Sequence, residues 1–376
     1  MVRSCWPQRR SHGATLETTT PCKDRLPSLG NQQDDHLTEA CLARELTSGC
    51  WPGSCVAVAS EIPRKVPPMP CVAFATSRDL PHATPDDQLA VDALRRRGIA
   101  VEPVVWDDPA VAWSAFDQVV IRSTWDYHLK PDLYERWLRG FLATPEQLRN
   151  PPESVLANLD KRYLRVLAER GAPIIPTAWV DRGPQRPLRD LLQANDWDQV
   201  VIKPAVSASA HGTWRTTLAK ADSDEPRFAA QAMASDLLIQ PFIPEIATRG
   251  EWSLVFIDGD FCHAVIKLPA GGDFRVQGEY GGRSIAATPT PELIAQAAAI
   301  LALVDGADHR PILYARIDGV ETADGFRLME LEINEPALYF KHSKDAAERF
   351  AAAIAGSIEL RRLVVRVAMP ARRLAA

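Results

Sequence analysis

The segment "ILYARIDGVETADGFRLMELEINEP", residues 312–336, predicts two strands joined by a turn at Thr322–Gly325. Polar side chains recur at every second position of these strands, which would place them on one face. They are Arg316, Asp318, Glu330, Glu332 and Asn334. Carboxylate and amide oxygens are ligands of Mg²⁺, whereas Zn²⁺ would call for His and Cys. The segment therefore predicts an oxygen-rich metal site.

Apolar residues stand between these polar positions. Leu328, Met329, Leu331 and Ile333 alternate with the acids and predict that the second strand is buried on at least one face. The alternative is a hairpin whose polar face is only solvated. We favour the metal site, because unpaired carboxylates on a buried strand are costly.

The composition is that of an ordinary globular protein. The chain has 376 residues, of which 46% are hydrophobic and 24% charged, enough for two or three domains. No apolar run approaches the roughly 20 residues that span a membrane, so we expect a soluble protein without membrane contacts. A net charge of −5 argues against general affinity for nucleic acid.

Residues 1–68 differ from the rest of the chain. They lack helical or strand periodicity and contain five of the seven cysteines. A disulfide module or a zinc site would explain the cysteines, but no CxxC or Cys–His spacing supports either. We expect a disordered or non-native extension, with Met69 as a natural initiator. The body then contains only Cys71 and Cys262, which agrees with a reducing cytoplasm.

The region after Met69 predicts an open α/β domain. Strands are expected at 71–77, 100–106 and 116–122, with a helix at 85–99 between the first two. Parallel sheets of this kind bind ligands beyond the carboxyl ends of their strands. The loop "STWDY" follows the third strand there, so the candidate substrate contacts are Arg122, Ser123, Thr124 and Asp126. Helix capping explains Ser123 and Thr124 nearly as well.

Two lysines and a loop of small residues predict a phosphate site. Lys161 falls in the first turn of a helix expected at 158–171, with Asn158 as its N-cap, and Lys203 lies on a buried strand at 199–204. The loop 205–214 follows, and its small residues let backbone N–H groups approach a phosphate. Its candidate contacts are Ser207, Ser209, His211 and Gly212. A mobile surface loop is the alternative, because the P-loop pattern GxxxxGK[ST] is absent.

The region 236–282 offers candidates for the rest of a nucleotide and substrate site. An extended segment suited to an adenine edge comprises Gln240, Pro241, Phe242 and Ile243, with Glu245 in reach of a ribose. A hairpin at 251–269, turning at Asp258-Gly259, presents Glu251 and Lys267. The loop 270–282 is too polar and too long to be only a connector, so we expect it to face the substrate. Its candidates are Arg275, Glu279 and Tyr280.

In this order, the features resemble the ATP-grasp superfamily. The resemblance runs from Asn158 to Pro336 through Lys161, "VIKP", the small-residue loop, "QPFIPE", Gly250–Glu251, Arg275, "ARIDG" and "ELEINEP". "RSTWDY", "VIKPAVSASAHGT" and "LMELEINEP" are most similar to the cyclo-ligase branch of D-cycloserine biosynthesis, which closes O-ureidoserine, and to glutathione-synthetase-like relatives. That similarity extends back to Met69.

The resemblance implies an α/β (α+β) ATP-grasp fold. It would comprise an open parallel pre-ATP-grasp domain and two ATP-grasp subdomains. The implied boundaries are 1–68 for the extension, 69–152 for the N-terminal domain, 153–235 and 236–358 for the subdomains, and 359–376 for an unpacked tail.

The resemblance also implies a role for each candidate. Lys161 and Lys203 would contact the phosphates of ATP, residues 240–243 the adenine, and Glu245 the ribose. Arg275 and Arg316 would steady the transferred phosphoryl group. Mg²⁺ or Mn²⁺ would be held by Asp318, Glu332 and Asn334, with Glu330 or Glu335 as an additional or replacement ligand.

Three functional hypotheses follow from the resemblance. The favoured one is an ATP-dependent carboxylate–amine ligase or cyclo-ligase that acts through an acyl phosphate on a small amino-acid derivative. The second is peptide-bond formation of the glutathione synthetase or glutamate ligase type, and the third is a regulatory nucleotide-binding protein without turnover. Homo-oligomers are common among ligases of this size, and the partner implied is a small amino-acid-like substrate.

Overall fold

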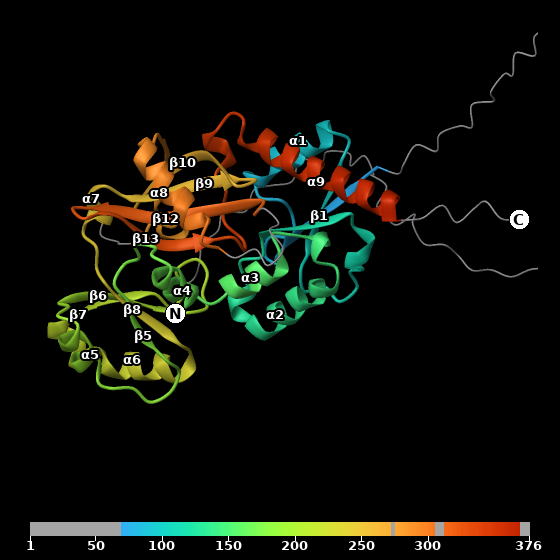
Figure 1. Ribbon diagram of the computed structural model, residues 1–376. Coiled ribbons are helices and arrows are strands. Elements are labelled where there is room, and N and C mark those ends of the chain that lie inside the picture. Colours follow the sequence, from blue (N-terminus) through green and yellow to red (C-terminus); the bar gives the residue numbers. More distant parts are fainter. Residues whose placement is uncertain (1–68, 272–274, 305–311, 369–376) are drawn as a thin grey trace, which may run out of the picture. The chain divides into compact units, whose positions relative to one another are not determined.

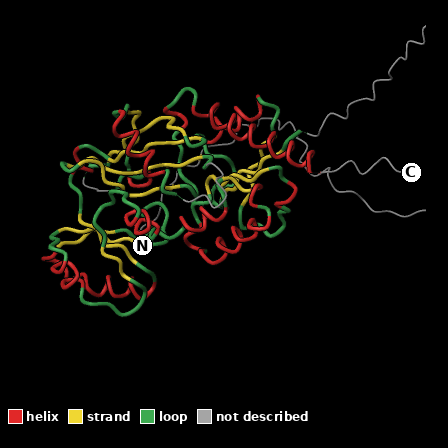
Figure 2. Tube along the Cα trace, in the orientation of Figure 1, coloured by secondary structure: helices red, strands yellow, loops and turns green. Residues whose placement is uncertain are grey.

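The computed structural model describes residues 69–271, 275–304 and 312–368, with side chains up to Leu363. Its strands form three sheets, drawn as arrows in Figure 1 and in yellow in Figure 2. The expected extension at 1–68 lies outside the described residues. None of the described helices combines the length and apolar character of a membrane span.

The N-terminal sheet is parallel, as the sequence predicts. Its order is β2-β1-β3-β4, and the paired neighbours all run parallel. Its elements are β1 (Cys71–Thr76), α1 (Asp87–Arg96), β2 (Ala100–Val105), β3 (Gln118–Ser123), α2 (Pro131–Arg139) and β4 (Leu148–Arg149). β1 and β3 are buried along their whole length, β2 only in part, and the apolar face of α1 packs against Val72, Phe74 and Val120.

The second sheet is antiparallel and has the order β5-β8-β6-β7. Its elements are β5 (Ala178–Val180), α5 (Leu188–Ala194), β6 (Gln199–Pro204), β7 (Trp214–Thr217), α6 (Ala221–Ala234) and β8 (Leu237–Pro241). α5 and α6 share its core, which includes Leu188, Ile202 and Phe228. Because β8 pairs with β5 and β6, this sheet extends beyond the subdomain boundary expected at residue 235.

The third sheet is also antiparallel and has the order β11-β10-β9-β12-β13. Its elements are α7 (Glu245–Thr248), β9 (Glu251–Ile257), β10 (Asp260–Leu268), β11 (Arg283–Ala287), α8 (Pro291–Leu301), β12 (Tyr314–Thr322) and β13 (Gly325–Glu332). Both hairpins that the sequence predicts are present, one turning at Asp258-Gly259 and the other at Thr322–Gly325. α8 packs against this sheet through Leu293, Ala297 and Ile300.

The helix expected at 158–171 is interrupted. α3 (Pro152–Asn158) ends where that helix was expected to begin, and α4 (Tyr163–Glu169) starts after a turn. Asn158 is therefore not an N-cap. Its side chain instead bonds to the backbone of Leu331 and Ile333, which fixes α3 against the end of β13.

The C-terminal helix is longer than expected. α9 (Ala346–Ala368) continues through residue 359, where the sequence predicts the start of a tail. Ile354 and Ile358 of α9 are buried beside Ala90 and Leu94 of α1, and Figure 1 shows the two helices side by side. Arg361 donates to the backbone oxygen of Asp117, so part of the predicted tail is packed.

A bulge in the β12–β13 pair changes the expected alternation. Asp318 lies opposite Glu330, but Gly319 lies opposite Leu328, so Met329 has no register partner. Met329 consequently joins Glu330 on the cavity side. A Cβ at Gly319 would approach the Phe326 ring to 2.2 Å, so the strand requires glycine at this position.

We expect Gly319→Ala to lower the free energy of unfolding by about 1–3 kcal/mol, because the added methyl overpacks the sheet. Urea denaturation monitored by tryptophan fluorescence measures the change. Gly356→Ala in α9 is the control: nothing lies within 4 Å of the position that the added Cβ would take, and alanine should stabilise the helix by about 0.5–1 kcal/mol. Equal stabilities of the Gly319 variant and the wild type would contradict the expected clash.

Candidate active site

A cavity of about 590 Å³ lies against the charged face of the third sheet. Seventeen of the predicted site residues line it: Lys161, Lys203, Ser207, Ser209, Gln240, Pro241, Phe242, Ile243, Glu251, Lys267, Arg275, Glu279, Arg316, Asp318, Glu330, Glu332 and Asn334. The other eight are outside its lining: Arg122, Ser123, Thr124, Asp126, His211, Gly212, Glu245 and Tyr280. The structure thus brings together lysines, arginines and acids from segments far apart in the sequence.

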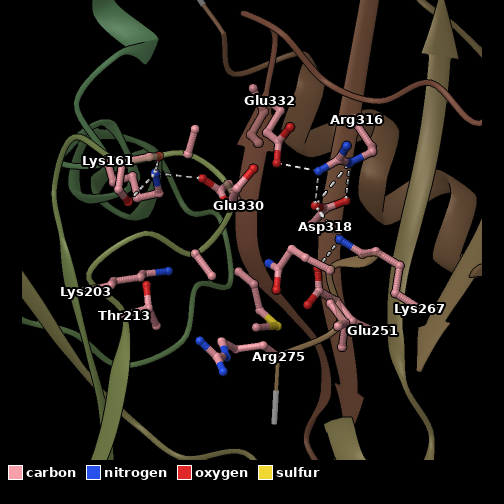
Figure 3. A pocket seen from close by; sticks show the side chains of 18 of the residues that line it. Lys161, Lys203, Thr213, Glu251, Lys267, Arg275, Arg316, Asp318, Glu330 and Glu332 are labelled. Carbon is pink, nitrogen blue, oxygen red and sulfur yellow. Dashed lines mark hydrogen bonds and ion pairs between the residues drawn. The ribbon is translucent and has the colours of Figure 1, made fainter. Parts of the chain in front are cut away.

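Two lysines form one side of the cavity (Figure 3). The ammonium of Lys161 donates to the backbone oxygen of Ser207 over 2.6 Å and lies 3.1 Å from Glu330. Lys203 reaches the cavity from β6, where burial lowers its pKa. Lys203 therefore loses its proton more readily than a lysine in water. An anion bound in the cavity would favour the charged form again.

The strand register creates the opposite side. In β9, β10, β12 and β13, Glu251 lies opposite Lys267, Ser253 opposite Asp318, and Arg316 opposite Glu332. Side chains of paired residues point to the same face of a sheet. One register therefore produces the whole charged network, and a shift of one residue would dissolve it.

The network neutralises Asp318 completely. Lys267 lies 2.9 Å from one carboxylate oxygen of Asp318, Arg316 donates to both, and Ser253 donates over 2.6 Å. Although burial opposes ionisation, these cations hold the pKa of Asp318 well below its usual range. Lys267 also pairs with Glu251 over 2.5 Å, and Arg316 pairs with Glu332. Asp318 is thus already saturated, which disfavours its predicted role as a metal ligand.

Burial and neighbouring charges shift the pKa values of the remaining acids. Burial raises the pKa of Glu332 to about 8, and the neighbouring Glu330 and Asp318 add to the effect despite the pairing with Arg316. Burial likewise raises the pKa of Glu335 to about 7, against the influence of Lys161. For Glu330, burial is outweighed by Lys161 and Lys203, and the pKa is lowered. Glu332 and Glu335 would ionise more readily with a further cation nearby.

These residues fit a divalent cation once one amide is considered. Among the described residues, no group of three or more His, Cys, Asp or Glu side chains is arranged to hold a metal. Asn334, however, accepts a hydrogen bond from Tyr134 through Oδ1, while its buried Nδ2 has no partner. The Tyr134 hydroxyl can also accept, so exchanging the amide oxygen and nitrogen would satisfy Nδ2 and release Oδ1. Glu332, this oxygen and a neighbouring carboxylate, Glu330 or Glu335, are then hard ligands of the kind that Mg²⁺ prefers.

The inner part of the cavity has apolar walls. Ile175, Val201, Ile243 and Met329 line it, next to the extended segment expected to meet adenine. The Phe242 N–H is already bonded to the Gln199 carbonyl, as an extension of the β6–β8 ladder. Glu245 begins α7 outside the lining, so the structure does not place it at a ribose.

Two loops meet over the cavity. Ser209 in the small-residue loop has φ 49°, and its hydroxyl donates to Glu279 over 3.5 Å. The Tyr280 hydroxyl donates to the Ser209 carbonyl, while the Arg275 guanidinium lies 3.5 Å from the centre of the Tyr280 ring. His211 is turned toward the N-terminal domain, with its ring 4.9 Å from that of His128.

The four predicted substrate contacts after β3 have other surroundings. Arg122 is buried, pairs with Asp87 over 2.8 Å and donates to the Pro336 carbonyl. Thr124 bonds to Tyr134, and Asp126 accepts from Trp106 and Lys130. None of the four lines the cavity: Arg122, Thr124 and Asp126 bond within the N-terminal domain, and Arg122 also bonds to the chain after β13. Neither Ser123 nor Thr124 caps the helices described after β3, and a direct contact with substrate stays a prediction.

The same loop does contribute aromatic residues that the sequence prediction passed over. Trp125 and Tyr127 line the cavity, as do Tyr163 and Tyr339. The quoted motif "STWDY" contains the first two, so attention to aromatic rather than polar residues would have found them. The sequence gives no comparable indication for Tyr339 or Met329. Tyr339 reaches the cavity through a left-handed backbone conformation, and Met329 through the bulge in β13.

Comparison with known proteins points to one family. The family model for the N-terminal domain of D-cycloserine synthetase DcsG matches residues 72–150. The cycloserine biosynthesis protein DcsG of Streptomyces lavendulae is 33% identical over 283 residues, covering 70% of this chain and 91% of that protein. A crystal structure of D-cycloserine synthetase DcsG superimposes with a TM-score of 0.69 at 30% identity, covering 77% of this chain and 99% of the other.

A more distant match concerns the fold alone. D-alanine–D-alanine ligase from Bacillus anthracis has a TM-score of 0.55 at 14% identity, covering 78% of this chain and 99% of that ligase. The ATP-grasp architecture expected from the sequence is confirmed by these similarities.

In EDTA, we expect Glu332→Gln to become more stable relative to the wild type as the pH rises from 4.5 to about 8. In this window an unfolded chain ionises Glu332 while the folded wild type retains its proton. The stabilisation linked to the raised pKa is therefore lost as the pH rises, and each pKa unit is equivalent to about 1.4 kcal/mol. Urea denaturation at several pH values measures the difference.

Glu330→Gln serves as the control for this titration. The pKa of Glu330 is lowered, so both folded and unfolded wild type are ionised above the ordinary value of 4.5. Its own titration therefore contributes nothing in this range, but Glu330 adds to the raised pKa of Glu332, so this variant should gain stability relative to the wild type by less than Glu332→Gln does. A pH-independent difference for Glu332→Gln would contradict the raised pKa.

Proposed function

Because the chain belongs to the DcsG family of ATP-grasp ligases, we propose that it activates the carboxylate of a small amino-acid derivative as an acyl phosphate. An amine or another nucleophile of the same or a second molecule then captures the acyl group. The protein is an ATP-dependent ligase that forms ADP and phosphate. The hypothesis of a regulatory protein without turnover is set aside accordingly.

The observation that carries the proposal is the placement of charge around one cavity. Lys161 and Lys203 on one side suit the phosphates of ATP, and Arg275 and Arg316 suit the phosphoryl group in transfer. Phosphoryl transfer requires positioned charges more than a protein nucleophile. The apolar walls at Ile175, Val201 and Met329 offer a surface for an adenine ring.

The metal assignment is narrower than the sequence prediction. We propose Glu332, Asn334 and one further carboxylate, Glu330 or Glu335, as ligands of Mg²⁺ or Mn²⁺, with Asp318 in a supporting role. When bound, the metal would offset the negative charge of the phosphates during transfer. Asp318 orients Arg316 and Lys267 toward the cavity through its hydrogen bonds.

Residues of this chain perform the remaining steps. Arg316, which donates to Asp318 and to the Ala337 carbonyl over 3.1 Å, would stabilise the γ-phosphate during its transfer. The contact between Ser209 and Glu279 brings the two loops together and would exclude water from an acyl phosphate. We also propose a cytoplasmic location, which agrees with the small number of cysteines after Met69.

We expect Glu332→Gln to reduce Mg²⁺-dependent ADP release by about 100-fold or more, since it removes a charge that would bind the metal. A coupled assay for ADP, run over a series of Mg²⁺ concentrations with a panel of amino acids and ureido derivatives, measures it. Circular dichroism establishes that the variant is folded. Glu292→Gln, at an exposed acid of α8, is the control, and unimpaired activity of Glu332→Gln would refute the metal assignment.

We expect Lys203→Met to raise the KM for ATP by about 10- to 100-fold, because the phosphates would lose their contact with the ammonium group. Fluorescence titration with a nucleotide analogue measures binding apart from turnover. Lys220→Met changes an exposed lysine and should leave the KM unaltered. An unchanged KM in the Lys203 variant would remove this lysine from the nucleotide site.

A further inference from the structure

The chain that follows β13 has an unusual set of hydrogen bonds. Six consecutive carbonyls, from Ile333 to Leu338, each bond to a side chain. The respective partners are Asn150, Tyr314, Trp125, Arg122, Arg316 and His263, at 2.8–3.1 Å. We call residues 333–338 the bonded segment. Irregular backbone is otherwise expected to be mobile, whereas here six separate side chains hold it in one conformation.

The bonded segment forms a wall of the cavity. Glu335 and Ala337 line the cavity, whereas Ile333 and Leu338 are buried in the core. Trp125 and Arg316 hold its backbone from the cavity side and buried side chains such as Asn150 hold it from the core, so the positions of the side chains that face the cavity are fixed. Preorganisation of this kind is typical of a surface that selects a ligand.

Glu335 differs in its ion pairing from the four cavity acids that lie on strands of the third sheet. Glu251 pairs with Lys267, Asp318 with Lys267 and Arg316, Glu330 with Lys161, and Glu332 with Arg316. Glu335 forms no ion pair within the part of the chain that the structure describes. A half-buried carboxylate without a cation is unfavourable, so its position favours a ligand that brings a positive charge.

The surroundings of Glu335 suit an organic cation. The Trp125 indole donates to the backbone carbonyl of Glu335 over 3.0 Å, and both Trp125 and Tyr127 line the cavity. Aromatic rings attract ammonium groups, particularly where water is displaced. Mg²⁺ keeps several waters and prefers carboxylate and carbonyl oxygens, whereas the faces of aromatic rings attract an organic ammonium group.

We propose that Glu335 binds the ammonium group of the substrate, between Trp125 and Tyr127. The substrate is then a zwitterionic amino acid whose carboxylate points toward Arg316 and whose amino group is held by the bonded segment. This inference rests on the proposed function and specifies its substrate class. It also assigns the further carboxylate of the proposed metal site to Glu330, leaving Glu335 to the substrate.

Calorimetry in the presence of Mg²⁺ and a non-hydrolysable ATP analogue tests the inference without turnover. The amino acid that binds most tightly from a panel including O-ureidoserine is compared with the same acid carrying hydroxyl in place of the amino group. We expect wild type to bind the amino acid about 10- to 100-fold more tightly. Glu335→Gln should lose this preference, and the affinity for the hydroxy acid should stay within about twofold.

Glu335→Asp keeps the charge and provides a second variant should the amide variant not fold. It should bind the amino acid more weakly than wild type while retaining a preference over the hydroxy acid. Glu292→Gln should behave as wild type. The inference is overturned if wild type does not prefer the amino acid, if Glu335→Gln weakens both ligands equally, or if its main effect is a higher Mg²⁺ requirement.

ADP release measured on the same samples separates this inference from the proposed function. Release of ADP without discrimination between the amino and hydroxy acids would keep the ligase function and remove the role of Glu335. Selective binding of amino acids without any ADP release would retain the ammonium site and contradict the proposed carboxylate activation.

Discussion

The cost of burying negative charge governs the organisation of this protein. Asp318, Glu251, Glu330 and Glu332 lie close together on one cavity, and each is paired with Lys161, Lys267 or Arg316. Carboxylates at such positions persist only when cations and hydrogen bonds compensate for lost hydration. The strand register places Lys267 and Arg316 beside their acids, and the turn after α3 brings Lys161 to Glu330.

Charges that the protein compensates only in part prepare the site for charged ligands. Lys203 is buried with a lowered pKa, whereas Glu332 and Glu335 have raised pKa values. Each of these shifts would be relieved by a ligand of opposite charge, phosphate for the lysine and a cation for the acids. The cavity thus has unfavourable electrostatics of both signs, in the places where a nucleotide, a metal and a zwitterion are proposed to bind.

The N-terminal domain contributes through contacts with the backbone beyond β13. Arg122, Trp125 and Asn150 donate to the bonded segment, and Tyr314 of β12 reaches both Asn334 and Ile121 of β3. These bonds connect the parallel sheet to the charged sheet directly under the proposed substrate position. Arg122, which the sequence predicts to contact the substrate, therefore contacts the backbone of the bonded segment instead.

The sequence by itself determined the pattern of the secondary structure and the chemistry of the site. Alternation predicted both hairpins and the face that carries Arg316, Asp318, Glu330 and Glu332, because side-chain direction in a strand depends only on local geometry. It could not predict which acids are neutralised. Asp318 is saturated, and Glu335 forms no ion pair with the described residues, because of partners brought from other strands and from distant loops. Only the tertiary structure decides those distances.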